Sequence, residues 1–291
     1  MSQLFTGAGV ALITPFKNNK IEFKALETII KNQVQGGMDY LVALGTTAES
    51  ATLTSEEKSE VIRCTKENAG ILPIIVGMGG NDTQAIINQI KNTNLDGVSG
   101  LLIVTPYYNK PSQEGMFRHY SAIAKESPLP IVLYNVPSRT GVNLEYDTVV
   151  RLAEASDKIV AVKEASGIMS QIASITKYTS DNFTVISGDD VLALPTTTIG
   201  GKGVISVIAN ALPSKVSSMI HLALKGNYAE ATKIHLELID LFKLIFKEGN
   251  PGGVKALMHI QGIIENELRS PMYKVSDETY DEIKEAYLKL Q

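Results

Sequence analysis

The hydrophobic positions of this chain fall into short runs that recur about every thirty residues, each followed by a stretch with helical spacing. The runs are apolar and often β-branched, which is typical of strands buried on both faces. They predict strands at residues 9–16, 40–45, 73–79, 100–106, 130–136, 159–165, 183–188 and 203–208. The stretches between them predict helices at residues 22–35, 55–68, 82–92, 112–126, 145–155, 168–178, from 191 and at 213–225. This alternation indicates parallel β/α units.

Eight β/α units are the number that closes a (β/α)8 barrel, and their span of about 225 residues fits that fold. An open doubly wound sheet is the alternative, and it is disfavoured because no GxGxxG motif follows the first strand. The sequence therefore predicts a TIM barrel over residues 1–226. Three further helices, at residues 228–246, 254–264 and 277–290, predict a C-terminal helical domain over residues 227–291 that packs on the barrel.

The net charge and the few cysteines and histidines limit which partners, compartment and metals the protein is expected to have. The net charge is −4 over 291 residues, so we expect neither a nucleic acid nor a membrane as partner. Residues 1–16 lack the basic head and cleavage site of a signal peptide, and Cys64 has no second cysteine to pair with. Both observations favour a cytoplasmic protein. The four histidines show no metal-ligand spacing, so no metal is expected.

One predicted strand, residues 159–165, contains a lysine in an otherwise apolar run. Alternation places Ala161, Lys163 and Ala165 on one face and Val160, Val162 and Glu164 on the other. Burial disfavours an ammonium, and an amine that loses its proton is a nucleophile able to form a Schiff base. The alternative is a structural lysine that reaches water or pairs with Glu164. Taken alone, this strand favours the structural alternative.

The ends of the other strands change that balance. Barrel enzymes place their chemistry at the carboxyl ends of the strands, and five predicted ends carry reactive or recognition side chains. A 2-keto acid bound as a Schiff base needs donors for its carboxylate, which Thr46 and Thr47 supply. Tyr134 could transfer the proton, and Arg139 could hold a second carboxylate. Each of these residues could also have a purely structural role. Five strand ends that all carry such side chains on one rim disfavour five independent structural roles.

Five motifs share an order and spacing with a known family. They are GTTAES (45–50), TPYYNKPSQEG (105–115), YNVPSRTG (134–141), VKEAS (162–166) and SGDD (187–190). They closely resemble the dihydrodipicolinate synthase family, whose members condense pyruvate with L-aspartate-4-semialdehyde in lysine and diaminopimelate biosynthesis. The resemblance runs from residue 7 to about residue 255. It implies a TIM barrel with a C-terminal helical domain, a lyase of the pyruvate-dependent aldolase type, and no metal or organic cofactor.

The resemblance also assigns roles to individual residues. It implies a pyruvate imine on Lys163, and a proton relay of Thr47, Tyr134 and Tyr108 in which Tyr108 enters the site of a neighbouring subunit. It implies that pyruvate lies against Thr46, Thr47, Gly188 and Ile205, and that Arg139 receives the carboxylate of the semialdehyde. A homotetramer built as a dimer of dimers follows from the same comparison, as does an effector pocket at Ser50, Asn81 and Tyr107.

Two departures from the family pattern stand out. Ala48 replaces a usual glycine, so either the backbone is regular there or the turn shifts. Ser55, Lys58 and Ala85 stand where lysine-inhibited members carry two histidines and a glutamate, and the charge of Lys58 would repel a cationic effector. We therefore expect lysine to inhibit weakly or not at all.

Two other functions stay open at this point. One is a different pyruvate-dependent aldolase of the same fold, acting on N-acetylneuraminate or a 2-keto-3-deoxy sugar acid. The sequence disfavours it because Arg139 and the YYNKP stretch suit a carboxylate rather than sugar hydroxyls. The other is a barrel that binds a keto acid without catalysis, which would be expected to lack Lys163, Tyr134 or the threonines.

Overall fold

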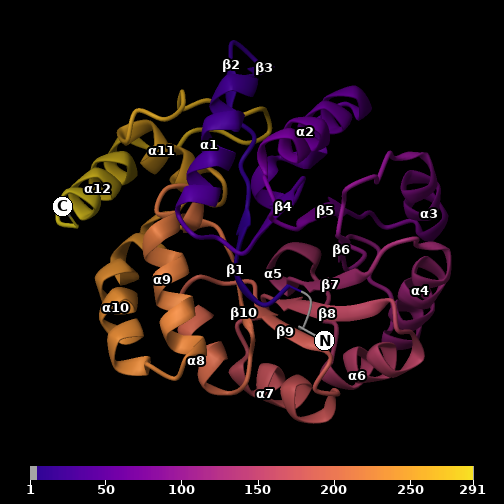
Figure 1. Ribbon diagram of the computed structural model, residues 1–291. Helices are drawn as coiled ribbons and strands as arrows, with labels where there is room; N and C mark the ends of the chain where they lie inside the picture. Colours follow the sequence, from indigo (N-terminus) through magenta and orange to yellow (C-terminus); the bar gives the residue numbers. More distant parts are fainter. Residues whose placement is uncertain (1–4, 291) are drawn as a thin grey trace.

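The computed structural model describes residues 5–290, and its core is a closed barrel of parallel strands (Figure 1). Within these residues eight strands form the barrel in the order β1-β10-β9-β8-β7-β6-β5-β4. They are β1 (Gly7–Ala11), β4 (Tyr40–Ala43), β5 (Ile74–Met78), β6 (Gly100–Val104), β7 (Ile131–Asn135), β8 (Ile159–Glu164), β9 (Thr184–Ser187) and β10 (Gly203–Ser206). The predicted (β/α)8 barrel is thereby confirmed.

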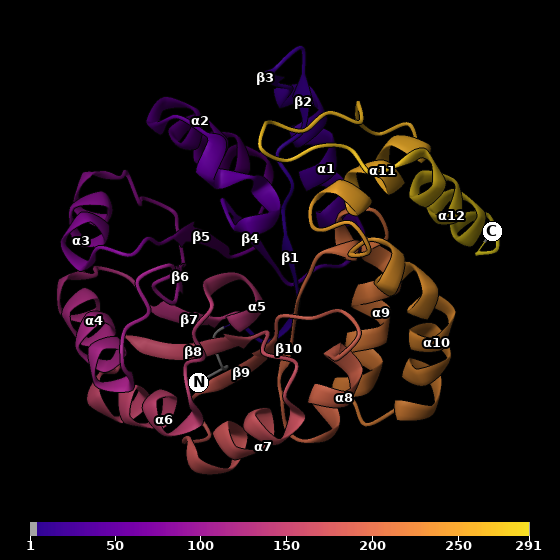
Figure 2. The same cartoon turned by 180° about the vertical axis from the view of Figure 1, so that it is seen from behind.

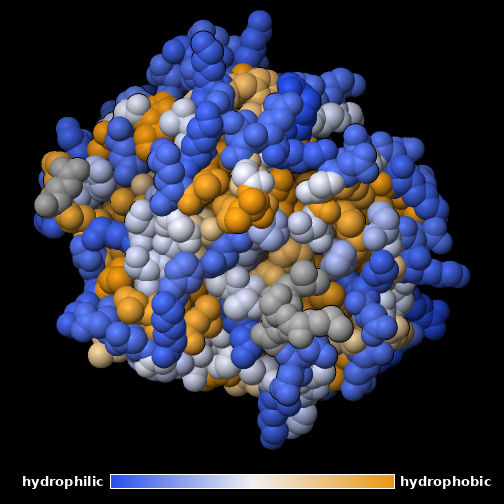
Figure 3. Space-filling model, in the orientation of Figure 1, coloured by the Kyte–Doolittle hydropathy of each residue, from blue (hydrophilic) through white to orange (hydrophobic). Residues whose placement is uncertain are grey.

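Helices surround this barrel on its outside, as the two opposite views show (Figures 1 and 2). They are α1 (Phe23–Gln35), α2 (Ser55–Asn68), α3 (Thr83–Asn92), α4 (Gln113–Glu126), α6 (Tyr146–Ala155), α7 (Met169–Tyr178), α8 (Ala193–Thr198) and α9 (Pro213–Leu224). Their apolar faces and the outer faces of the strands form one core, and the side chains inside the barrel form a second. Seen from one side, hydrophilic residues cover much of the surface with apolar ones between them (Figure 3).

The helices that follow the barrel are α10 (Tyr228–Leu244), α11 (Gly252–Ile260) and α12 (Asp277–Leu288). In both views α10 lies beside α9, and α12 lies at the outer edge. The boundary predicted after residue 226 falls in the turn between α9 and α10, and the division into two domains stays a prediction. The second of these predicted helices, 254–264, is shifted, because Gly262 adopts a φ of 72° and the helix ends before it.

The first predicted strand, 9–16, is wrong in its second half. The barrel strand ends at Ala11, and Pro15, which has no N–H for a strand ladder, excludes a strand that continues through residue 16. The Ile13 N–H instead donates to the Asn210 side chain. The chain then forms a small hairpin, β2 (Phe16–Lys17) and β3 (Lys20–Ile21), whose turn is made by two asparagines at positive φ.

The alternation predicted for the lysine strand holds except at Val160. Ala161 faces the barrel interior and Val162 the surrounding helices. Between β7 and β8 the pairing passes from Ile159 directly to Ala161, so Val160 is an irregular position and packs against the interior residues. From Ala161 onward the register is regular, and Lys163 pairs with Tyr134 across the two strands.

Candidate active site

Lys163 points into the barrel at the carboxyl end of β8 and is only 5% exposed. Its Nζ lies 4.4 Å from the centre of the Tyr134 ring. No carboxylate within the described residues lies within 4 Å of this amine. The alternative that Lys163 pairs with Glu164 is therefore wrong. The lysine is buried beside an aromatic face and lacks a counter-charge.

Glu164 faces the opposite side of the sheet and has its own partners. Its carboxylate accepts hydrogen bonds from the Asn135 amide at 2.9 Å, the Gln171 amide at 2.9 Å and the Ser166 backbone N–H at 2.6 Å. Asn135 and Glu164 are paired across β7 and β8, one step beyond Tyr134 and Lys163. This network fixes the two strand ends to each other, and so fixes Tyr134 against Lys163.

The two threonines lie in a tight turn after β4. Thr46 and Thr47 begin the short 3-10 helix η1 (Thr46–Ala48). The left-handed residue of this turn is Glu49, with φ of 52°, while Ala48 has regular helical backbone. Alanine therefore fits here without strain, which resolves the first departure in favour of a regular backbone. The Ala48 carbonyl also accepts a hydrogen bond from the buried Thr14 hydroxyl at 2.8 Å.

Gly188 leaves room for the lysine side chain. A Cβ at this position would lie 3.2 Å from Lys163 Cε and 2.7 Å from the Ala165 Cβ. Its N–H donates to the Glu164 carbonyl at 2.7 Å, which holds the end of β9 against β8. A side chain at Gly188 would therefore clash with Ala165 and crowd the end of the Lys163 side chain. Ile205 lies deeper, fully buried among the interior residues, and does not line the cavity described next.

A cavity of about 170 Å³ opens above these residues. It is lined by Thr46, Thr47, Tyr134, Val136, Ser138, Arg139, Lys163, Ala165, Gly188, Asp189, Val207, Phe246 and Asn250. The Thr46 hydroxyl, the Tyr134 hydroxyl and the Arg139 guanidinium form no side-chain hydrogen bond or ion pair with any described residue. A cavity that collects an amine, two hydroxyls and a guanidinium without internal partners suits a small anionic carbonyl compound.

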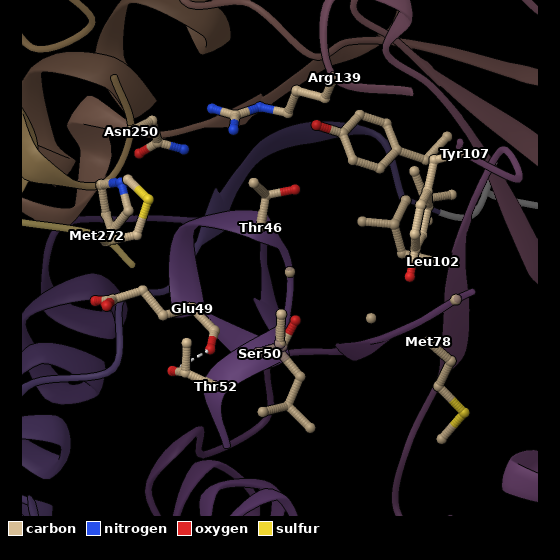
Figure 4. Close-up of a pocket in the computed structure, with 18 of the residues that line it drawn as sticks. Thr46, Glu49, Ser50, Thr52, Met78, Leu102, Tyr107, Arg139, Asn250 and Met272 are labelled. Atoms are coloured by element: carbon tan, nitrogen blue, oxygen red, sulfur yellow. Dashed lines mark hydrogen bonds between the residues drawn. The ribbon is translucent and has the colours of Figure 1, made fainter. Parts of the chain in front are cut away.

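Arg139 lies on α5 (Pro137–Thr140), a short helix after β7 that the sequence pattern does not predict. From there it also borders a larger cavity of about 540 Å³, which contains Ser50, Lys58, Tyr107 and Met272. Arg139 and Asn250 lie at one end of this cavity, and Thr46 stands between them and the turn that carries Glu49, Ser50 and Thr52 (Figure 4). The arginine is therefore placed to meet a molecule that enters from the larger cavity.

The remaining predicted residues lie farther out. Tyr108 is 84% exposed, has a φ of 70° and lines neither cavity. Within one chain the structure therefore does not bring Tyr108 to Lys163. Asn81 donates a hydrogen bond to the Tyr107 carbonyl at 3.3 Å but does not line the larger cavity itself.

Two residues that the sequence analysis missed belong to this region. Asn250 precedes α11 and donates from its amide to the Thr47 hydroxyl at 3.0 Å. Lys255, in α11, is completely buried and bonds to Glu49 at 2.5 Å. The signal for Lys255 is the one that identified Lys163, a lone lysine in an apolar run.

Among residues 5–290 no group of three or more His, Cys, Asp or Glu could hold a metal ion, and no helix is long and apolar enough to cross a membrane.

Known proteins match this chain over nearly its whole length. A model of the dihydrodipicolinate synthetase family matches residues 4–290. The 4-hydroxy-tetrahydrodipicolinate synthase of Parabacteroides distasonis is 49% identical over 286 residues, which are 98% of this chain and 96% of that protein.

Solved structures agree with this result. Dihydrodipicolinate synthase of Cyanidioschyzon merolae, determined with lysine bound, matches with a TM-score of 0.95 and 37% identity over 99% of each chain. A monomeric dihydrodipicolinate synthase variant matches with a TM-score of 0.96 and 37% identity over 98% of this chain and 97% of that one. The likeness therefore extends through the helices that follow the barrel.

Proposed function

The chain belongs to the dihydrodipicolinate synthetase family, and on that premise we propose that it condenses pyruvate with L-aspartate-4-semialdehyde through an imine on Lys163. The product is 4-hydroxy-tetrahydrodipicolinate, and the reaction belongs to lysine and diaminopimelate biosynthesis. The observation that supports this most directly is the surroundings of Lys163. A buried amine without a counter-charge lies on a cavity lined by unpaired hydroxyls and a guanidinium.

The chemistry begins with attack of the Lys163 amine on the ketone carbon of pyruvate. Loss of water gives the imine, and loss of a C3 proton gives an enamine. The enamine carbon then bonds to the aldehyde carbon of the second substrate, and the resulting alkoxide takes up a proton. The substrate's own amine displaces Lys163 and closes the ring. The imine itself serves as the electron sink, so we propose that no metal or organic cofactor takes part.

Each site residue has a role in this proposal. Thr46 and Thr47 bind the pyruvate carboxylate, and Gly188 keeps the space beside the amine open. Ile205 packs below the bound pyruvate. Tyr134, beside Lys163, transfers protons together with the Thr47 hydroxyl. Arg139 receives the carboxylate of the semialdehyde, since its guanidinium is unpaired and borders both cavities.

Tyr108 completes the relay from a neighbouring subunit in this proposal. A tyrosine that is 84% exposed and strained at positive φ has no role within its own chain that would explain either property. Projection into a second copy would account for both. We propose a homotetramer built as a dimer of dimers, located in the cytoplasm. Sedimentation should then give a tetramer, and a monomer with full activity would contradict the role of Tyr108.

Reduction with borohydride tests the central step. Incubation with pyruvate and borohydride should add a stable mass to the chain, and peptide mapping should place it on Lys163. The same experiment without pyruvate is the control. Absence of an adduct would refute both the synthase and the sugar-acid aldolase alternative. Comparison of aspartate semialdehyde with sugar aldehydes as acceptors then separates these two.

A further inference from the structure

Arg139 depends on its loop for its position. Its side chain is exposed, and its guanidinium forms no hydrogen bond or ion pair with any described residue. It lies on α5, within the loop of residues 136–143 that follows β7. A long side chain without internal partners is confined only by the backbone from which it extends. The space that the guanidinium can reach is therefore set by this loop.

The two ends of the loop are tied together at its base. Asn135, the last residue of β7, accepts a hydrogen bond from the Leu144 backbone N–H at 2.9 Å through its Oδ1. Its Nδ2 donates to Asn143 Oδ1 at 2.8 Å. Both Asn135 and Leu144 are fully buried. The entry and the exit of the loop are therefore held by one amide side chain.

The base of the loop is bonded in turn to the buried carboxylate of Glu164. Asn135 Nδ2 donates to this carboxylate at 2.9 Å, and Gln171 Nε2, from α7, donates to it at 2.9 Å as well. Asn143 Nδ2 donates to Gln171 Oε1 at 2.8 Å, which closes a ring of four polar side chains. Glu164 forms no ion pair with any described residue, so its charge depends on these donors. Removing one member would leave other polar groups of the ring unpaired, and the four side chains therefore hold one another in place.

The same ring reaches the strand of the proposed imine lysine. Glu164 follows Lys163 directly on β8. The Asn135–Glu164 pair lies one step beyond the Tyr134–Lys163 pair in the register of β7 and β8. The ring therefore joins the loop that carries Arg139 to the strand that carries Lys163, and limits how far apart these two side chains can be.

We propose that Asn143 is a positioning residue that sets the distance between Arg139 and Lys163 and thereby selects the length of the second substrate. It is the member of the ring that belongs to the loop, and it lines neither cavity, so it acts through Arg139 and not on the substrate. In L-aspartate-4-semialdehyde two carbon atoms separate the aldehyde from the carboxylate. A carboxylate held by Arg139 brings the aldehyde to the enamine only if that spacing matches. This inference rests on the proposed function, because Arg139 must bind the acceptor for its position to matter.

Kinetics of Asn143→Ala test whether the residue affects the second substrate alone. For aspartate semialdehyde kcat/KM should fall about tenfold, mainly through a higher KM, because a misplaced guanidinium binds the acceptor less well. The rate of pyruvate adduct formation should stay the same, since the register of Tyr134 and Lys163 is kept by the strands themselves. A purely structural role would impair both steps together, and equal loss in both would overturn the proposal.

A double-mutant cycle with Arg139→Ala tests whether the effect passes through the guanidinium. In the Arg139→Ala background Asn143→Ala should change kcat/KM by less than about twofold, because no guanidinium remains to be misplaced. If Asn143→Ala still costs tenfold there, Asn143 acts independently of Arg139 and the proposal fails. Asn143→Ser, a smaller change, replaces the alanine variant if melting curves show that the latter does not fold.

Two acceptors that differ by one methylene group test the selection of length. Succinic semialdehyde has the same length as aspartate semialdehyde, and glutaric semialdehyde is one methylene group longer. Both lack the amine that closes the ring, so borohydride can trap the coupled product on Lys163, where its mass distinguishes it from the pyruvate adduct. The parent protein should couple the shorter acceptor at least about tenfold faster, and Asn143→Ala should reduce that ratio. A parent protein without this preference, or an unchanged ratio in the variant, would overturn the proposal.

Asn68→Ala is the matched control, since it removes an amide donor to the Cys64 carbonyl in α2, and the kinetics of both steps should not change. Borohydride trapping with pyruvate separates the two levels of inference. If the parent protein gives no Lys163 adduct, the proposed function fails. If the adduct forms and the semialdehyde condenses but the cycle is additive, only the role of Asn143 fails.

Discussion

Lys163 and Lys255 are both buried lysines, and their surroundings are opposite. Lys255 bonds to the Glu49 carboxylate at 2.5 Å and the Glu267 carbonyl at 2.9 Å, and lies 4.3 Å from the centre of the Phe16 ring. Lys163 also lies beside an aromatic ring, but its amine has no carboxylate within 4 Å in the described part of the chain. A cavity borders Lys163 and does not reach Lys255. Burial alone therefore does not distinguish the two lysines, whereas a missing counter-charge next to an open cavity does, and this difference supports the catalytic role proposed for Lys163.

The residues around Lys255 link the C-terminal segment to the barrel, as the contacts of Arg269 show. Arg269 binds both oxygens of Glu57 at 2.6 and 2.7 Å and donates to the Thr52 carbonyl at 3.1 Å. It also lies 4.5 Å from the same Phe16 ring that Lys255 covers. The Lys255 and Arg269 charges are thus paired with Glu49 and Glu57 inside the protein. The cluster joins the C-terminal segment to the turn and to the start of α2.

Substituting each lysine by methionine, which keeps the side-chain length, should separate the two roles. Lys163→Met should lower kcat/KM by about 10⁴- to 10⁶-fold, the range for removing a central member of a catalytic unit. No pyruvate adduct should form, and the free energy of unfolding should change by less than about 1 kcal/mol, since the lysine has no ionic partner to lose. Kinetics, borohydride trapping and denaturant unfolding measure these effects. If Lys163→Met loses stability but still forms the pyruvate adduct, Lys163 has the structural role instead.

Lys255→Met should have the opposite signature. It leaves Glu49 buried without its partner, which should reduce the free energy of unfolding by about 3–5 kcal/mol. The folded fraction should still form the pyruvate adduct. The variant that also carries Glu49→Gln should recover much of that stability because no buried charge remains unpaired. If the single variant is as stable as the parent protein, the pair is not structural.

The pH dependence of the free energy of unfolding gives a further test of the buried Lys255. Burial, opposed by Glu49, lowers the pKa of Lys255 from 10.5 to about 8. Between pH 8 and 10.5 the unfolded chain keeps a proton that the folded chain has released, so this group makes stability rise with pH. The full effect is about 3 kcal/mol. The difference in free energy of unfolding between the parent protein and Lys255→Met should widen over that range, and a constant difference would contradict the assignment.

Arg139→Ala should affect only the second substrate. Loss of a charge-assisted pair is worth about 1.5–3 kcal/mol, so kcat/KM for aspartate semialdehyde should fall roughly 10- to 100-fold. The rate of pyruvate adduct formation should stay the same, because Lys163 and the threonines are untouched. Arg139→Lys should recover part of the loss but not the two-point contact. Equal loss in both steps would place Arg139 in the pyruvate site instead.

A third lysine, Lys58, gives the smallest expected effect. It is half-exposed and lines the larger cavity together with Ser50 and Tyr107, and its amine has no described ionic partner. Its positive charge should keep free lysine out, so titration with millimolar lysine should leave the initial rate nearly unchanged. Lys58→His should increase any inhibition. Strong inhibition of the parent protein would show that this pocket accepts a second cation.

The fold and much of the site can be predicted from local sequence because both follow local rules. Buried parallel strands are apolar runs, and barrel chemistry lies at their carboxyl ends, so Lys163, Tyr134, Thr46 and Arg139 follow from strand assignment alone. Asn250 and Lys255 do not, because their partners Thr47 and Glu49 are more than two hundred residues away. Local pattern finds a lone lysine in an apolar run in both places, and only the fold shows which one has a carboxylate beside it.

The contact between Asn250 and Thr47 also has a consequence for the order in which the protein is made. The two residues are 203 positions apart. At about 5–20 residues per second of synthesis, Thr47 is added to the chain roughly 10 to 40 s before its partner. All eight barrel strands precede Asn250 in the chain. A nascent or prematurely terminated chain can therefore contain all the barrel strands and Lys163 while the Thr47 hydroxyl still lacks its Asn250 partner.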